Sequence, residues 1–176
     1  MLSSMSPKRG RVGVVMPHGV LFRGAEEARI RECIVKGDML EAVIGLPTNL
    51  FYSTSIPACL LIFRAKKATE RKDSVLFVDA SQQYVKGKNQ NHLAPEVIED
   101  VVSAYRSEPA GVPSRLVPLS ELKERYWDLN VARYVGHAAA EAVAVADVLG
   151  RVRQARLLLD EAEDRLDQLL RKAGYE

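Results

Sequence analysis

The sequence predicts an α/β protein: part of a doubly wound sheet followed by a long helical extension. Three observations support this class. Short apolar runs alternate with a helical pattern over the first 63 residues, and prolines border these runs. The last part of the chain, from His137 to Lys172, contains no proline and repeats its apolar residues at steps of three and four.

Four apolar runs are expected to form strands: Val12–Met16, Leu40–Leu46, Ala58–Phe63 and Val75–Val78. Pro17 and Pro47 end the first two runs, because proline cannot donate to a sheet ladder. The first and third runs are apolar almost throughout, which predicts strands covered on both faces. Three early strands and one helix cannot cover both faces of a sheet. We therefore expect the later helices or a neighbouring chain to supply further layers.

Two helices are expected before the extension. The first spans Ala25–Lys36, has Ile30, Cys33 and Ile34 as its apolar face, and ends at Gly37. Pro95 begins the second helix, whose apolar stripe is expected to consist of Ile98, Val101, Val102 and Tyr105. A loop at Ser107–Ser114 follows, and Ser120 is expected to cap a short helix that ends at Arg125.

The extension has the apolar repeat of a left-handed coiled coil. A helix with such a face needs a partner, which the sequence leaves open as its own domain, a second copy or another protein. The residues of this seam are Val145, Val148, Val152, Ala155, Leu159, Ala162, Leu166 and Leu169.

Composition limits the classes of function. The chain has 176 residues and a net charge of +2, which by itself requires neither nucleic acid nor a membrane as partner. No apolar run approaches the roughly 18 residues of a transmembrane helix, and no signal peptide is visible, so we expect a cytoplasmic protein. Cys33 and Cys59 fit no zinc pattern and are expected to be inert core positions.

Catalytic patterns are scarce. His18, His92 and His137 have no metal-ligand spacing, and neither a glycine-rich phosphate loop nor a nucleophile triad is visible. His18 follows a strand end, where open α/β sheets place ligands, although a surface-loop histidine is the more common explanation.

Two segments have residues suited to nucleic acid. The loop from Leu46 to Pro57 contains Phe51, which we expect either to pack half-buried or to stack on a base. The linker after the third strand is either a solvated loop or a surface that faces phosphates. Its cations are Arg64, Lys66, Lys67, Arg71 and Lys72.

Several segments resemble, in the correct order, the modification (M) subunit of type I restriction-modification systems. The similarity covers most of residues 10 to 135. The segments are Gly10–Gly24, Glu27–Arg31, Ala42–Pro47, Asn49–Thr54, Ala58–Lys67, Trp127–Asn130 and Arg133–Val135.

The resemblance implies a Rossmann-like methyltransferase sheet of seven strands, of which this chain would contain the last three: the fifth, sixth and seventh. The seventh strand would be antiparallel and lie between the other two. The family transfers a methyl group from S-adenosylmethionine to adenine N6 in DNA. Phe51 falls where related enzymes stack an aromatic ring on the flipped base. The extension would bind the specificity subunit, and the restriction subunit would complete the system.

The chain departs from the family in two respects. The catalytic Asn-Pro-Pro-Phe/Tyr motif and the glycine-containing cofactor motif are absent, and in the family both lie upstream. We therefore expect the chain alone to be inactive, with no catalytic, cofactor-binding or metal-binding residues of its own. The expected division is a partial methyltransferase domain at 1–80, an α/β extension at 81–136 that packs on it, and a partner-binding helix at 137–176.

Two other functions stay open at this point. The chain could be a stand-alone interaction protein that forms a homodimer through its helical extension and has no role in methylation. It could also be a remnant that binds nucleic acid through the cations between Arg64 and Lys72, with an affinity that falls steeply with salt.

Overall fold

The structure of the chain is a computed structural model that describes residues 5–52 and 54–136, together with scattered helical positions between 153 and 172. The chain divides into two compact units, Met1–His137 and Ala138–Glu176. Each unit is described by itself.

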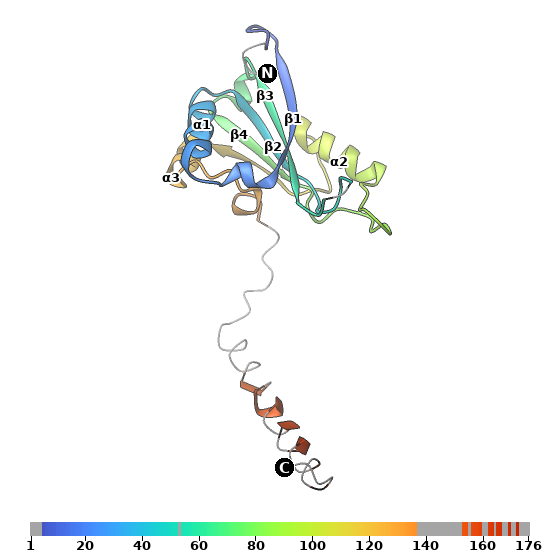
Figure 1. Cartoon of the computed structure of the whole chain (residues 1–176). Helices are drawn as coiled ribbons and strands as arrows, with labels where there is room; N and C mark the ends of the chain where they lie inside the picture. Colours follow the sequence, from blue (N-terminus) through green and yellow to red (C-terminus); the bar gives the residue numbers. More distant parts are fainter. Residues whose placement is uncertain are drawn as a thin grey trace. The chain divides into compact units, whose positions relative to one another are not determined.

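A five-stranded mixed sheet forms the centre of the first unit (Figure 1). Its spatial order is β1-β3-β2-β4-β5, and β3 pairs antiparallel with both β1 and β2. β2 and β4 are parallel, whereas β5 is antiparallel to β4. The strands are β1 (Arg11–Pro17), β2 (Leu40–Gly45), β3 (Ala58–Arg64), β4 (Ser74–Asp79) and β5 (Ser114–Pro118). Because β1, β2 and β4 run in the same direction, their carboxyl ends lie at one edge of the sheet.

Helices cover both faces of this sheet. Figure 1 shows α1 (Ala25–Lys36) and α2 (Pro95–Arg106) on opposite sides of the strands. The short helix α3 (Leu119–Glu124) follows β5 directly. Three 3₁₀ turns complete the described elements: η2 (His18–Leu21), η3 (Thr69–Arg71) and η4 (Val131–Arg133).

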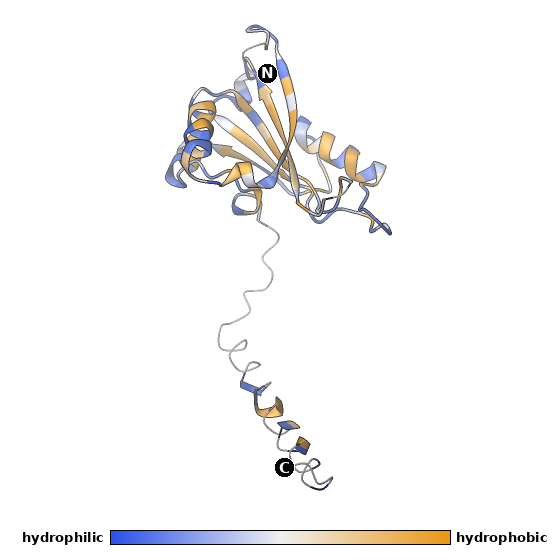
Figure 2. Cartoon of the chain, viewed as in Figure 1, coloured by the Kyte–Doolittle hydropathy of each residue, from blue (hydrophilic) through white to orange (hydrophobic). Residues whose placement is uncertain are grey.

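Side chains that alternate along the strands form two cores, one on each face, and the strands are the most apolar part of this unit (Figure 2). The larger core joins Val35 of α1 and Leu122 of α3 to Val43, Phe77 and their neighbours. The smaller core joins Ala104 of α2 to β2 and β4 at Ala42, Ile44, Leu76 and Val78.

The four predicted strands are all present, but the expectation that the first is covered on both faces is wrong. β1 is an edge strand whose residues alternate between exposed and half-buried, and the Val15 side chain is 51% exposed. β5 was not expected at all. It begins at Ser114, where the predicted loop ends, and only Val117 of its residues is buried.

Two predictions about helix ends and faces are also wrong. Ser120 does not cap α3, because the helix begins at Leu119 after Pro118 and has no side-chain cap. The predicted apolar face of α1 is correct only at Ile34, which packs against the larger core. Arg31 and Val35 are its buried residues, whereas Ile30 is 57% exposed.

The predictions for the cysteines and for the apolar stripe of the second helix are each correct in part. Cys59 is buried as expected, but the prediction of a core position is wrong for Cys33, which is exposed on α1. On α2, Val101 and Tyr105 pack against the smaller core, whereas Ile98 and Val102 are exposed.

The second unit is described only in part. Val145, Val148, Val152 and Ala155 of the predicted seam lie outside the described residues. Leu159, Leu166 and Leu169 are helical, and each is more than half exposed. No helix among the described residues is both long enough and apolar enough to cross a bilayer.

Candidate functional site

A buried arginine fixes the segment that follows β1. Arg31 on α1 donates from Nη1 to the carbonyl oxygens of Val20 and Arg23, at 3.1 and 2.7 Å, and from Nε to the carbonyl oxygen of Trp127 at 3.3 Å. Burial lowers the pKa of this guanidinium, while the nearby carboxylates of Asp128 and Glu27 oppose that shift. Arg31 therefore ties α1 to the η2 segment and to the turn before η4.

The η2 segment lies at the carboxyl ends of the parallel strands. His18 directly follows β1, and its backbone N–H donates to the Pro57 carbonyl at 2.9 Å. A cavity of about 100 Å³ brings His18 together with Gly45, the last residue of β2, and Asp79, the last residue of β4. Burial lowers the pKa of His18, and the charges of Asp79 and Asp128 oppose this. His18 is therefore half-buried at the edge where such sheets bind ligands, and is not a freely solvated loop residue.

The loop from Leu46 to Pro57 leaves the same edge. Its anchor is Asn91, a buried side chain whose Nδ2 donates to the Thr48 carbonyl at 2.9 Å. The backbone N–H of Asn91 also donates to the carbonyl of Asn49 at 2.7 Å. Asn49 has a left-handed backbone with φ of 53°, a conformation that asparagine tolerates better than most residues. This anchor could not be predicted from the sequence, because residues 82–92 are polar and follow no regular pattern.

Phe51 is at the exposed part of this loop. Its side chain is 40% exposed, and the neighbouring Tyr52 is 86% exposed. Phe51 lines a groove of about 190 Å³ together with Val15 of β1 and Ile56. An aromatic ring is thus held beside an apolar groove at the carboxyl edge, where it is available to a flat ligand.

Most cationic side chains of the predicted basic linker form ion pairs or hydrogen bonds within the chain. The Lys67 side chain is 1% exposed, and its ammonium group pairs with Asp38 and donates to the Ser74 carbonyl at 2.6 Å. Arg64 pairs with Glu41, and Arg71 donates to the Tyr105 carbonyl and to Ser107 Oγ. Lys66 and Lys72 are exposed and have no ion pair within the described residues.

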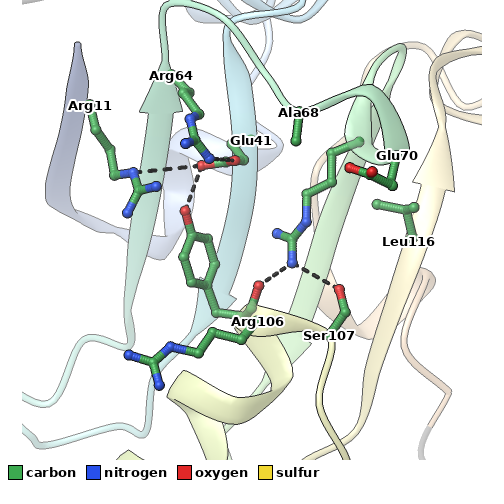
Figure 3. A pocket seen from close by; sticks show the side chains of 10 residues that line it. Arg11, Glu41, Arg64, Ala68, Glu70, Arg106, Ser107 and Leu116 are labelled. Carbon is green, nitrogen blue, oxygen red and sulfur yellow. Dashed lines mark hydrogen bonds and ion pairs between the residues drawn. The ribbon is translucent and has the colours of Figure 1, made fainter. Parts of the chain in front are cut away.

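A second cavity, of about 550 Å³, lies at the opposite edge of the sheet (Figure 3). We call it the amino-edge pocket, because it lies at the start of β1 and β2, the end of β3 and the carboxyl end of α2. Its lining includes four guanidinium groups and two carboxylates. The lining residues are Arg11, Glu41, Arg64, Ala68, Glu70, Arg71, Tyr105, Arg106, Ser107 and Leu116.

Glu41 is the buried anion of the amino-edge pocket, with only 1% of its side chain exposed. Its carboxylate accepts hydrogen bonds from Arg64 Nη1 at 2.8 Å and from the Tyr105 hydroxyl at 2.5 Å, and Arg11 Nε lies 4.0 Å away. Burial acts to raise the pKa of Glu41. The hydrogen bonds and the two arginine charges outweigh it, and this pKa lies below its ordinary value.

The described residues contain no group of three or more His, Cys, Asp or Glu side chains that could hold a metal ion. The pocket residues of both edges come from elements far apart in the sequence, so neither pocket could be found from residue spacing. Phe51 and Arg64 were predicted as site residues from the sequence, but the residues that contact them in the pockets were not.

Comparison with known proteins gives a consistent result. A family model described as N-6 DNA methylase matches residues 1–142. The MjaVII methylase subunit, a type I restriction enzyme subunit of Methanocaldococcus jannaschii, is 39% identical over 131 residues, which is 72% of this chain and 23% of that protein. The MpnII methylase subunit of Mycoplasma pneumoniae is 34% identical over 133 residues, covering 75% of this chain and 24% of that protein.

A solved structure shows the same similarity. The methyltransferase subunit of a type I restriction-modification system from Streptococcus thermophilus is 38% identical, has a TM-score of 0.69, and matches 76% of this chain and 28% of its own. The chain spans about a quarter of the length of the curated relatives that it matches.

Proposed function

Because the chain belongs to the N-6 DNA methylase family, we propose that it forms the later part of the methyltransferase domain of a type I modification subunit. Within the complete protein, that domain would transfer a methyl group from S-adenosylmethionine to adenine N6 in DNA. The observation that supports this best is the strand order. β3 is antiparallel and lies between β1 and β2, as expected for the seventh strand between the fifth and the sixth. Family membership does not favour the alternative of a stand-alone interaction protein.

The free edge of β1 is where we place the remaining strands of the sheet. Only one side of β1 pairs with a described strand, and the Val15 side chain of this strand is exposed. An unpaired edge with an exposed apolar side chain readily pairs with another strand. In the complete domain, the preceding strand of the sheet would cover this edge.

Phe51 is the residue that we assign to the target base. An enzyme that modifies a base must take it out of the helical stack and hold it between flat or apolar side chains. The exposed ring of Phe51 and the apolar groove beside it provide such a surface at the carboxyl edge. Stacking of this kind contributes about 1–3 kcal/mol per base.

The described residues do not fit S-adenosylmethionine by themselves. The cavity at His18 and Asp79 measures about 100 Å³, whereas small-molecule sites usually measure about 300–1,000 Å³. We therefore assign no step of methyl transfer to this chain through the cofactor. Its own part would be to present Phe51 and to complete the sheet.

Partner binding is assigned to the helical extension. Leu159, Leu166 and Leu169 are exposed helical residues with the spacing of one apolar seam, and Val145, Val148 and Val152 continue that seam in the sequence. We propose that this seam binds the specificity subunit. The division of the chain that follows is a methyltransferase part at residues 1–80, its extension at residues 81–136, and the partner-binding helix at residues 137–176.

Lys66 and Lys72 are the linker cations that we assign to DNA. Both are exposed and have no ion pair within the described residues, so contact with phosphates would break no internal bond. Arg64, Lys67 and Arg71 would contribute to DNA binding less directly, because each has partners in the fold.

A chimera tests the proposed activity. Residues 5–136 replace the matching segment of the MjaVII methylase subunit, which is then assayed for adenine methylation with its own specificity subunit. We expect the chimera to methylate DNA. Phe51→Ala should reduce kcat/KM roughly fivefold or more, since a stacking contact is lost. Tyr52→Ala, an exposed aromatic neighbour, is the matched control and should stay near the unsubstituted chimera. A folded but inactive chimera, or equal losses at both positions, would contradict the proposal.

The extension is tested separately with the full chain. The double variant Leu159→Asp and Leu166→Asp should lose capture of the specificity subunit, because charges replace two seam residues. Gln154→Asp adds a charge at another exposed helical position and should leave capture unchanged. Light scattering of the isolated chain distinguishes homodimerisation through the same seam from binding of the specificity subunit.

A further inference from the structure

We propose that the amino-edge pocket binds a phosphate-class oxyanion, with Arg71, Arg106 and Arg11 as the groups that recognise it. This site is separate from the carboxyl edge, and the proposal does not depend on the methyltransferase assignment. The same chemistry could belong to a free phosphate ester or to a phosphate of a nucleic acid backbone.

The distribution of charge in the pocket is the first argument. Four guanidinium groups face two carboxylates. Glu41 is already satisfied by Arg64 and Tyr105, so it does not neutralise the remaining arginines directly. Arg11 reaches Glu41 only at 4.0 Å and is half exposed. Arg106 has no hydrogen bond or ion pair within the described part of the chain. Positive charge is therefore left over at the surface of the pocket.

Arg71 gives the second argument. Its Nη2 donates to the Tyr105 carbonyl and to Ser107 Oγ, and its guanidinium lies 5.0 Å from the centre of the Tyr105 ring. These contacts fix the orientation of the side chain. Its Nη1 is buried and has no hydrogen-bond partner. A buried donor without an acceptor is costly, so an oxyanion that accepts from Nη1 would be bound by a group already held in place.

The dimensions of the pocket give the third argument. A volume of about 550 Å³ lies within the range of small-molecule sites and is larger than a single phosphate requires. Figure 3 shows Arg11 directed toward Glu41, whereas Arg106, the last residue of α2, also lines the pocket but extends away from Glu41. Guanidinium groups recognise phosphate through paired hydrogen bonds, and several around one cavity suit a diphosphate better than a lone carboxylate.

The location separates this pocket from the base-binding loop. Phe51 is at the carboxyl edge, whereas the pocket is at the amino edge, and the seven residues of β1 span roughly 20 Å between the two. The pocket therefore faces away from a substrate held at Phe51, which favours a separate phosphorylated ligand.

Calorimetry on the full chain tests the proposal, with inorganic pyrophosphate and a short single-stranded oligonucleotide as probes. We expect pyrophosphate to bind, and Arg106→Gln to weaken it roughly fivefold or more, since one charged donor is lost. Arg71→Gln should weaken it further. Arg29→Gln removes an exposed arginine from α1, away from the pocket, and is the control that should bind like the unsubstituted chain.

The probes distinguish the source of the phosphate. Binding of pyrophosphate that is lost in Arg106→Gln supports a free phosphate ester. Binding of the oligonucleotide alone, with the same loss, supports a backbone phosphate. No binding of either probe at millimolar concentration would overturn the proposal, as would equal affinities in Arg106→Gln and Arg29→Gln. Because Arg106 has no described partner, its variant is expected to fold normally even where Arg71→Gln does not.

Discussion

Replacement of Arg31 tests how the carboxyl edge is held in place. Arg31→Met keeps most of the apolar stem of the side chain but removes the guanidinium, and with it the three hydrogen bonds to the carbonyls of Val20, Arg23 and Trp127. The Val20 and Arg23 carbonyls belong to one segment, and the Trp127 carbonyl belongs to another that lies far along the chain. Their loss should therefore loosen the η2 segment, and with it His18, and should also reduce the stability of the whole unit.

The magnitude follows from two opposing contributions. Hydrogen bonds to a charged group contribute about 1.5–3 kcal/mol each, and the variant loses three of them. Burial of the guanidinium also costs several kcal/mol of desolvation free energy, and the methionine variant avoids this cost. We expect a net loss of about 2–4 kcal/mol in the free energy of unfolding.

Urea titration of the full chain, followed by the fluorescence of its one tryptophan, measures this loss. Trp127 accepts one of the three bonds, so its emission also reports local loosening. Arg29→Met is the matched control. Arg29 is exposed and pairs with Glu26 at 3.1 Å, and such a surface pair contributes less than about 1 kcal/mol. A loss for Arg31→Met no larger than that of the control would refute the reasoning.

Three further predictions concern other buried groups. Lys67→Met should lower the free energy of unfolding by about 2–4 kcal/mol in urea titration, because it breaks the buried ion pair with Asp38. The control Lys66→Met should change it by less than about 0.5 kcal/mol. A larger loss for Lys66→Met than for Lys67→Met would show that the Lys67 ion pair does not stabilise the fold. Burial raises the pKa of the Cys59 thiol to about 11, so a thiol reagent should label Cys33 in the folded chain and Cys59 only on unfolding; equal rates would contradict this. Burial raises the pKa of Tyr134 to about 12, so its contribution to stability is complete below pH 10 and should be lost as the pH rises toward 12. Phenolate absorbance during alkaline titration checks it, and ionisation near pH 10 without unfolding would contradict it.

Much of the sheet could be predicted from the sequence, because its inner strands are apolar runs, and prolines border those of β2 and β3. β2, β3 and β4 were located in this way, and the family resemblance supplied the antiparallel position of β3. β5 could not be found by the same signal. It is an edge strand with one buried residue, Val117, so its sequence has no continuous apolar run.

The supporting residues of the candidate sites were beyond the reach of sequence patterns for a different reason. Arg31, Asn91 and Lys67 are polar, and a periodicity argument places polar residues on the surface. Each is buried because it satisfies backbone carbonyls or a carboxylate from a distant segment. Those partners become neighbours only once the chain has folded. Phe51 was identified because it lies in a loop with a neighbouring aromatic and polar residues between two apolar strands, and because the family resemblance places a base-stacking ring there.

The errors in the predicted apolar faces support the proposed place of this chain in a larger domain. Val15 and Ile30 were expected to be buried because of their apolar patterns, and the structure exposes both. Ile30 lines an apolar groove of about 330 Å³ that lies between α1 and the strands β1 and β3. An apolar groove next to an unpaired strand edge is unfavourable in water, because it leaves apolar surface and backbone donors uncovered. The same two features are what further strands and helices of a doubly wound sheet would cover. If the proposed function is correct, the apolar pattern that includes Val15 and Ile30 reflects their burial in the complete domain. These two exposed residues then lie where the rest of that domain packs.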